Sequence, residues 1–581
     1  MRCFLFLLVA LSGCSESSMG APDASSSDSS VDARARIDAG PDRVDASIPP
    51  PPPVGASPVG ASSALIVDGQ TYVSDPHRDT LWVFDHRAAE LRDRVEFAPG
   101  SEPGRMAASG RTLAVVLRDG SLAWVSTNSL SVTRVDNVCT APRGVDLDDD
   151  GVAHVACAGG ELVRVTSDGV QDRRFVARDL RDVVVDGDRI FVSILRRADV
   201  FLLEGDELTR VELPDSPEIG DANTAWQMKR AEEGGVTLLH QRSMQTPILV
   251  EERMAYGNGV RCRFGGVVET AISHIDRAGT VTTGPSLQTA ALGVDFAIFQ
   301  EGDIVLANAG MSPMVRTGSI ALYADVRETE CTDADGLFIP AEPVSAIATD
   351  RTDVLGWRPR SAELVVWDPG ADPTVIPTGA APMTNEGQRI FHEATPSFLA
   401  CASCHPEGRE DGVTWNFSTG SRRTQSLVIG DLGSTAPFHW NGDHESMERI
   451  MVGSFVERMG AELPPADAIA ATTEWLSSLP IVRAHVQDES AAARGEALFD
   501  ERCTGCHSGA HGTNNESVDV GTGGVFQVPP LPGVSIREPY FHNGCAESLD
   551  AVLDGCGAPH PGSESLSSAE RSDLLSYLGT L

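Results

Sequence analysis

Residues 68–85 read DGQTYVSDPHRDTLWVFD, and this stretch defines the repeat that decides the fold of residues 63–378. It holds a turn at Asp68-Gly69 followed by two β-rich strands, TYVSD and TLWVFD. Further turn signals follow at Ser109-Gly110, Asp150-Gly151, Asp186-Gly187, Gly234-Gly235, Glu301-Gly302 and Asp350. The first spacings are about 41, 41 and 36 residues, and insertions lengthen the next two to about 48 and 67. Repeats of this length with several short strands predict a β-propeller.

Each unit carries two strands that can be read from the sequence. In chain order they are TYVSD and TLWVFD, TLAVVL and SLAWVS, VAHVAC and ELVRVT, RIFVSI and DVFLLE, VTLLHQ and ILVEE, DIVLANA and SIALYAD, and DVLGW and ELVVWD. Seven units predict seven blades. A pair of β-sandwiches would also contain many short strands, but it does not predict a fixed period. The fold implies no function, and we expect a docking or sensing platform.

Two motifs change the character of the chain beyond the repeats. CASCH occupies residues 401–405 and CTGCH occupies residues 503–507, and each is C-x-x-C-H, the attachment signature of a c-type haem. Two thiols at this spacing bind the vinyl groups of one porphyrin, and the next His becomes the proximal iron ligand. A thioredoxin-like pair or a zinc site would leave the trailing His unexplained. The predicted haem-binding residues are Cys401, Cys404, His405, Cys503, Cys506 and His507.

The sequence therefore predicts two covalently bound haems c. Helical periodicity surrounds both motifs, so we expect two mainly α-helical, cytochrome-c-like domains at residues 379–485 and 486–581. A chain of 581 residues is too long for one core and is expected to form several domains. Its net charge of −38 argues against nucleic acid and against an anionic membrane surface as partners. That charge could steer a small basic redox protein, or it could serve solubility alone.

The N-terminus carries an export signal. Arg2 precedes an apolar run at residues 4–11 that is too short to span a bilayer, and Leu-Ser-Gly-Cys14 resembles a bacterial lipobox. We expect residues 1–13 to be a lipoprotein signal peptide and Cys14 to be acylated, with an ordinary secretory signal as the alternative. Residues 14–62 are rich in Ser, Asp and Pro and predict a disordered tether. The expected location is the cell envelope, at the outer membrane facing the periplasm, with membrane contact only through the lipid.

The cysteine count agrees with export. Of 12 cysteines, Cys3 leaves with the signal, Cys14 takes lipid and four bind haem, which leaves six. An even remainder in an oxidising compartment suggests three disulfides. Proximity favours the pairs Cys139–Cys157, Cys262–Cys331 and Cys545–Cys556, although six cysteines allow 15 pairings.

Residues 383–581 contain further motifs around the two C-x-x-C-H sequences. Gly-x-x-Ile-Phe or Gly-x-x-Leu-Phe precedes each, APFHWNGD (436–443) follows the first, FQVPPL (526–531) and PYFHNG (539–544) follow the second, and a helix is expected at 568–581. This combination resembles bacterial dihaem cytochrome c peroxidases and the related dihaem enzyme that matures methylamine dehydrogenase. With the N-terminal propeller, the arrangement looks like a lipoprotein subgroup of these cytochromes.

The resemblance implies a mechanism. A small cytochrome or cupredoxin gives electrons to the second haem, they cross a bridging Trp, and hydrogen peroxide is reduced to water at the first haem. By position the bridge is Trp440, which could equally be core packing against the porphyrin. The family also implies an interdomain Ca²⁺, although no carboxylate constellation in the sequence supports it.

The residues available as sixth iron ligands differ from those of the family. Residues 406–438 contain no His and no Met, so the first iron takes His439, reaches His444 or Met459, or stays open. We favour His439, with a hydrogen bond to a propionate as its alternative role. No Met follows Met459, so the second iron loses the family Met ligand. Its candidates are His511, His542 and His560, of which we favour His560, and His in place of Met predicts a lower potential.

The residue expected to perform acid–base catalysis also differs from that of the family. Aligned on Glu-Met, the sequence Glu457-Arg458-Met459 places Arg458 where family peroxidases carry a catalytic Glu. Arg can polarise an O–O bond by donating hydrogen bonds but cannot act as a base, and it could instead pair with a propionate. The catalytic candidates are Trp440, Glu457 and Arg458. Three functions follow: a peroxidase, a dihaem oxidase that modifies a substrate docked on the propeller, and an electron-transfer or redox-sensing cytochrome.

Overall fold

The computed structural model describes residues 57, 59–215, 220–257, 266–312, 318–324, 326, 331–338, 342–369, 371–484 and 488–581. The predicted signal peptide, the lipid site at Cys14 and most of the tether lie outside these residues. Within the described ranges, no helix combines the length and the apolar character needed to cross a bilayer.

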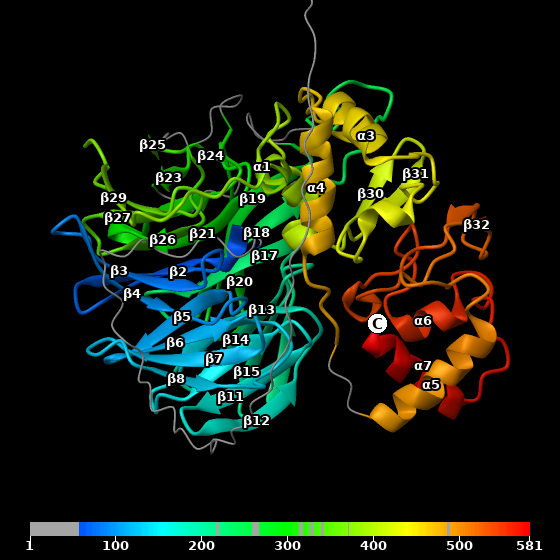
Figure 1. Ribbon diagram of the computed structural model, residues 1–581, viewed down its shortest axis with the longest axis horizontal. Helices are drawn as coiled ribbons and strands as arrows, with labels where there is room; N and C mark the ends of the chain where they lie inside the picture. The colour runs from blue at the N-terminus through cyan, green and yellow to red at the C-terminus, as the bar shows by residue number, and fades with distance from the viewer. Residues whose placement is uncertain are drawn as a thin grey trace, which may run out of the picture. The chain divides into compact units, whose positions relative to one another are not determined.

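Seven antiparallel sheets follow one another along the chain and form the blades of a β-propeller (Figure 1). The innermost strand of each sheet contacts that of the next, and β1 contacts β26, which closes the ring. The first four sheets are β1 (Ser63–Val67), β2 (Gln70–Asp75), β3 (Thr80–Asp85) and β4 (Glu90–Glu96); β5 (Pro103–Ser109), β6 (Thr112–Leu117), β7 (Ser121–Ser126) and β8 (Val132–Val135); β9 (Pro142–Leu147), β10 (Ala153–Cys157), β11 (Glu161–Thr166) and β12 (Gly169–Phe175); and β13 (Leu180–Asp186), β14 (Arg189–Ile194), β15 (Val200–Glu204) and β16 (Glu207–Val211). The predicted seven-bladed propeller is confirmed.

The last three blades carry the insertions. They are β17 (Asp221–Arg230), β18 (Val236–Ser243), β19 (Val268–Ile275) and β20 (Val281–Leu287); β21 (Gly293–Ile298), β22 (Ile304–Asn308), β23 (Ile320–Tyr323) and β25 (Gly336–Phe338); and β26 (Ala346–Thr349), β27 (Val354–Arg358), β28 (Glu363–Trp367) and β29 (Thr374–Pro377). A short strand, β24 (Cys331–Thr332), leaves the sixth unit and joins the fifth sheet parallel to β20. Three-residue 3₁₀ segments lie at Val59–Ala61 and Gln300–Gly302.

One predicted strand was wrong. ILVEE (248–252) is not the second strand of the fifth blade, because β19 (Val268–Ile275) pairs with β18 instead. The segment leaves the propeller, and a β-bridge joins Ile248 to Phe417 in the haem-binding part of the chain. Val268–Ile275 is almost entirely buried within the blade, whereas Ile248 packs in an apolar cluster with residues of the haem-binding part of the chain, such as Leu399.

The disulfide predictions are confirmed where the structure describes both cysteines. Cys139 pairs with Cys157, and Cys545 pairs with Cys556. Cys331 is disulfide-bonded as well. Cys262, its predicted partner, lies outside the described residues.

The C-terminal region consists of two small modules with the same plan. The first contains α1 (Glu386–His392), α2 (Cys401–Cys404), the hairpin β30 (Thr414–Phe417) and β31 (Gly420–Arg423), α3 (Met447–Ile450), a π-helix at Met451–Arg458 and α4 (Ala466–Ser478). The second contains α5 (Glu489–Arg502), β32 (Ser517–Val518), β33 (Phe526–Gln527), α6 (Leu549–Asp554) and α7 (Ser568–Thr580). Short 3₁₀ segments lie at Pro406–Gly408, Leu432–Thr435 and Val534–Ile536.

A glycine lets two helices cross in each module. A Cβ atom on Gly387 of α1 would lie 2.2 Å from the carbonyl oxygen of Ala471 in α4. A Cβ atom on Gly495 of α5 would lie 2.0 Å from the carbonyl oxygen of Asp573 in α7. The helices α5 and α7 lie side by side in Figure 1. Any larger residue would force these helices apart, which explains the Gly in both motifs.

The two modules also share a loop. Residues 436–449 and 538–551 each contain a cis peptide bond before Pro (Ala436-Pro437 and Glu538-Pro539), an Asn-Gly pair and a Ser that caps a helix. This internal repeat places Trp440 and His542 at equivalent positions.

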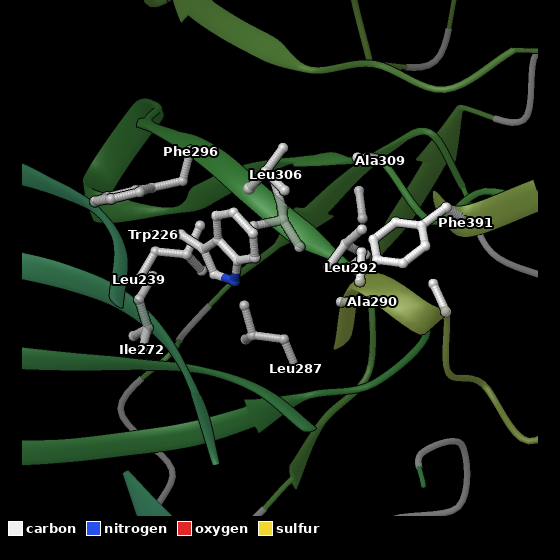
Figure 2. Packing of buried hydrophobic residues seen from close by; sticks show 14 of the residues in the cluster. Trp226, Leu239, Ile272, Leu287, Ala290, Leu292, Phe296, Leu306, Ala309 and Phe391 are labelled. Atoms are coloured by element: carbon white, nitrogen blue, oxygen red, sulfur yellow. The ribbon is translucent and has the colours of Figure 1, made fainter. Parts of the chain in front are cut away.

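The propeller and the first module are packed together through an apolar cluster. Phe391 of α1 lies beside Ala290 and Leu292 of the propeller (Figure 2). The same cluster continues to Trp226 and Phe296 between the fifth and sixth blades. Burial of this continuous surface fixes the first module against the propeller.

A buried carboxylate adds an electrostatic contact at the same boundary. Glu407, two residues after His405, bonds the guanidinium of Arg181 at 2.5 Å and that of Arg143 at 3.2 Å. These arginines come from β13 and β9 of neighbouring blades, and all three side chains are buried. The surrounding arginines, Arg143 first among them, hold the pKa of Glu407 well below its usual range.

Candidate haem sites

The first motif forms a short helix, and His405 follows it directly. The Nδ1–H of His405 donates to the carbonyl oxygen of Arg409 at 3.0 Å. This bond leaves the Nε2 lone pair free to bind a metal. Burial lowers the pKa of His405, which favours the neutral imidazole that a metal requires.

The second motif repeats this arrangement. It begins where α5 ends, and the Nδ1–H of His507 donates to the carbonyl oxygen of Gly512 at 2.9 Å. Burial lowers the pKa of His507 to about 4, so its ring is neutral at physiological pH. In both motifs the ring orientation and protonation state fit a proximal haem ligand.

The four motif cysteines are free thiols. Cys401, Cys404, Cys503 and Cys506 form no disulfide, whereas the cysteines of both described disulfides lie outside the motifs. Each pair therefore remains available for two thioether bonds. The thiols and the oriented histidines together form a donor set that fits haem c at both motifs.

A cavity of about 290 Å³ adjoins the first motif and contains Cys401, Cys404 and His405 in its wall. Apolar side chains form much of the rest, among them Leu399, Ile429, Phe438, Met447, Met451 and Phe455. A wall of this composition suits the apolar faces of a porphyrin.

The predicted residues of the first site differ in their placement. His439, Trp440, Arg458 and Met459 all line this cavity. Glu457 is exposed and does not line it, and only its backbone takes part, accepting a hydrogen bond from Met254 N. The geometry therefore brings Arg458, and not Glu457, to the site.

The side chain of Arg458 reaches the cavity from a π-helix, Met451–Arg458. This rare helix type is frequently found at functional sites, where its wider turn changes the direction of the side chains that follow. Phe455 from the same segment also lines the cavity.

His439 belongs to a polar group at the edge of the cavity. Its Nδ1 lies 3.3 Å from an Asp443 carboxylate oxygen, and the Nδ1 of His444 lies 3.1 Å from the same atom. The His439 and His444 ring centroids are 4.2 Å apart. The hydrogen bond from His439 lowers the pKa of Asp443 to about 2. His444 is absent from the cavity wall, and the role of His439 as distal ligand stays a prediction.

The structure distinguishes the three histidines that are candidates for the sixth ligand at the second motif. The His560 ring faces His507 at a centroid distance of 6.2 Å with an interplanar angle of 25°. A metal ion held about 2 Å from a nitrogen of each imidazole would separate the centroids by roughly 6 Å. His511 instead hydrogen-bonds the carbonyl oxygen of Ile429, and His542 stacks on Phe526 with ring centroids 3.7 Å apart.

Trp440 lies at the junction of the two modules. Its indole N–H donates to the carbonyl oxygen of Arg423 at 2.7 Å, and its own carbonyl accepts from Gln527 N at 2.8 Å. Its ring meets His542 edge-on, with centroids 6.4 Å apart. Trp440 therefore contacts both modules while it lines the first cavity.

Sequence reasoning missed the propeller's contribution to the first cavity. Ile248, Val250, Tyr256 and Val267 line it, although they precede the first motif by more than a hundred residues. The loosened spacing of the fifth unit was the one sequence signal of an insertion, and it gave no indication of where the insertion packs.

The calcium prediction finds no support in the described residues. The two groups of potential metal ligands there are His439, Asp443 and His444, and His86, Asp350 and Asp353. Both include histidine, whereas Ca²⁺ takes oxygen ligands. An interdomain calcium stays a prediction.

The haem stoichiometry follows from the two donor sets. The purified protein is expected to contain two haems per chain, measured as the pyridine haemochrome against protein concentration. Replacing Cys503→Ala and Cys506→Ala together is expected to reduce this to one, because the thioether partners of one porphyrin are lost. Loss of both haems, or of neither, would contradict independent attachment at the two motifs.

Comparison with known proteins agrees with the motifs. The methylamine utilization protein MauG of Methylorubrum extorquens is 28% identical over 283 aligned residues, which cover 35% of this chain and 80% of that protein. No protein-family model matches the chain.

The solved structures that superpose on this chain have lower sequence identity to it. Hydrazine synthase of Kuenenia stuttgartiensis superposes with a TM-score of 0.43 at 13% identity, over 55% of this chain and 98% of that one. A MauG-like protein associated with microbial copper homeostasis gives a TM-score of 0.26 at 22% identity, over 34% and 89%. We draw no function from superpositions this loose. The similarity to MauG and the paired C-x-x-C-H sites support a dihaem, cytochrome c peroxidase-like family for this chain, with c-type haem bound covalently.

Proposed function

We propose that this chain is an exported dihaem cytochrome that reduces hydrogen peroxide at the first motif, with electrons passed from the second. The observation that carries the proposal is the asymmetry of the two sites. His507 is faced by His560, whereas His405 makes no ring contact with another His among the described residues and borders an apolar cavity. An iron with one open position can bind peroxide, and an iron between two histidines suits electron transfer.

The first site offers hydrogen-bond donors to a bound peroxide. A haem held there by Cys401, Cys404 and His405 would supply the iron for peroxide reduction, in which H₂O₂, two electrons and two protons give two water molecules. Arg458 lines the cavity and can donate hydrogen bonds to a peroxide oxygen. Because Arg stays protonated and does not release its proton, the protons must come from another group or from water.

Trp440 is the proposed route for electrons between the modules. It is buried, it lines the first cavity, and it is hydrogen-bonded to Gln527 of the second module. The electrons would come from a small cytochrome or cupredoxin, which the net charge of −38 would attract if the donor is basic. The lipid anchor at Cys14, the periplasm-facing outer-membrane location and a protein partner on the propeller belong to the same proposal.

The test is a reaction of the half-reduced protein with one equivalent of hydrogen peroxide, followed by stopped-flow visible absorption. We expect the reduced low-spin bands of the second haem to be lost within milliseconds. Trp440→Phe keeps the packing but removes the indole, and it is expected to slow this loss about tenfold or more, equivalent to about 1.4 kcal/mol in the barrier. Trp124→Phe, the same change at a buried Trp in β7 of the propeller, serves as the control.

Other outcomes of this reaction would favour one of the two alternative functions. Two low-spin haems that do not react with peroxide would contradict the peroxidase and leave an electron carrier or sensor. Fast reaction with peroxide but no turnover with any small redox donor would instead favour the second candidate, a dihaem oxidase acting on a docked substrate. The absence of a carboxylate at the Arg458 position favours that candidate, because peroxidase turnover needs proton transfer.

A further inference from the structure

The described part of the insertion between β18 and β19, residues 244–257 and 266–267, is anchored to the first module by backbone hydrogen bonds. Ile248 N donates to the carbonyl oxygen of Asn416 at 2.8 Å, and Ser418 N donates back to that of Ile248 at 2.9 Å. Farther along, Met254 N donates to the carbonyl oxygen of Glu457 at 2.7 Å. The insertion therefore holds a fixed position along both β30 and the π-helix.

Tyr256 is the polar side chain that this insertion brings into the first cavity. Its backbone N–H donates to the carbonyl oxygen of Arg458 at 3.2 Å, and its own carbonyl accepts from Val267 N at 2.8 Å. These two bonds fix the residue from both sides. Its side chain lines the cavity, as does that of Arg458.

The two side chains form a pair. Arg458 Nη1 donates to the Tyr256 hydroxyl oxygen at 3.3 Å. The Arg458 guanidinium also lies 6.0 Å from the centroid of the Tyr256 ring and 5.8 Å from that of Phe417. Contact with two aromatic rings holds the cation in place without neutralising it.

The pair retains unused hydrogen-bond donors. Among the described residues Arg458 forms no salt bridge, so its charge and its remaining N–H groups are available at the cavity wall. The Tyr256 oxygen accepts from Arg458, which leaves its O–H free to donate to a further group. Burial raises the pKa of Tyr256, and the phenol therefore keeps its proton at neutral pH.

We propose that Tyr256 and Arg458 together form the binding site for a small oxygen ligand or anion, such as hydrogen peroxide, at the first haem. The inference rests on the proposed function and adds that the propeller supplies part of the site. Arg458 donates to the ligand and orients Tyr256, and Tyr256 donates its hydroxyl proton in a hydrogen bond. The propeller thus completes the first haem site in addition to any role in docking.

The test uses fluoride, a small anion that binds ferric haem and accepts hydrogen bonds. The full-length, haem-loaded ferric protein is titrated with fluoride at pH 7, and both the affinity and the position of the high-spin charge-transfer band are recorded. Tyr256→Phe is expected to weaken binding about tenfold and to shift the band, because one donor is lost. Arg458→Gln is expected to weaken binding by about tenfold to a hundredfold, because its hydrogen bond is charge-assisted.

Tyr72→Phe is the matched control. The Tyr72 hydroxyl is buried in the propeller and donates to the carbonyl oxygen of Thr127, outside the cavity. This variant is expected to bind fluoride like the wild type. If Tyr256→Phe also does so, with an unshifted band, Tyr256 is not part of the ligand site and the inference is overturned while the peroxidase proposal stands.

Two further results would overturn the inference in distinguishable ways. If Tyr256→Phe weakens binding but Arg458→Gln does not, the two residues do not act as a pair and Arg458 has another partner, such as a haem propionate. If the wild type binds no fluoride at millimolar concentrations and shows only low-spin haem, the first iron has no open position. That result removes both the inference and the proposed peroxidase.

Discussion

Replacing Glu407 with Gln is expected to lower the free energy of unfolding by about 3–5 kcal/mol, measured by urea denaturation of the full chain. The carboxylate is buried and lies between Arg143 and Arg181 from neighbouring blades. Its neutral replacement leaves the buried guanidinium of Arg181 without a carboxylate partner, whereas Arg143 keeps its salt bridge to Asp179 at 2.7 Å. An uncompensated charge is costly in a low-dielectric interior.

An exposed ion pair between the propeller and the second module provides a control. Arg197 and Glu547 form an ion pair at 2.9 Å, but both side chains are largely exposed. Glu547→Gln is expected to leave the denaturation midpoint nearly unchanged, because solvent screens exposed pairs. Equal effects of Glu407→Gln and Glu547→Gln on the free energy of unfolding would show that the burial of the Glu407 ion pair does not add to stability.

The same carboxylate predicts a pH dependence. The arginines hold the pKa of Glu407 well below its usual range, so its contribution to stability is fully present above the unfolded-state pKa of about 4.3. That contribution is lost as the pH falls toward the folded-state pKa. Between pH 5 and pH 3 the wild type should therefore lose more stability than Glu407→Gln, and parallel curves would contradict this assignment.

Replacing His560 with Ala is expected to convert the second haem from low-spin to high-spin in the ferric protein, as measured by electron paramagnetic resonance and visible absorption. The ring of His560 faces His507 at a centroid distance that an ion between two imidazoles would produce. Without His560, a haem held by Cys503, Cys506 and His507 would have one protein ligand to its iron and would be high-spin. The potential of the second haem is expected to rise in the same variant.

His511→Ala and His542→Ala are the comparisons that make this result specific. His511 is hydrogen-bonded to Ile429, and His542 is stacked on Phe526. Both variants are expected to retain the low-spin signal. If the signal survives in His560→Ala and disappears in one of the others, the sixth ligand is that residue.

The sequence by itself determined the parts that depend on local chemistry. The period near 40 residues predicts the blades, because each unit encodes its own turns and strands. The C-x-x-C-H spacing predicts haem attachment, because both thiols and the ligand come from five consecutive residues. Two disulfides were predictable for the same reason, since their cysteines are separated by only 18 and 11 residues.

The tertiary structure alone decided what depends on contacts between distant segments. Nothing in ILVEE distinguishes a blade strand from a segment that pairs with residue 417, since both require an apolar run. The meeting of Tyr256 with Arg458, and of Glu407 with Arg143 and Arg181, depends on where the propeller packs against the first module. Composition and spacing carry no information about that packing, because it is set by the summed burial of surfaces from both parts of the chain.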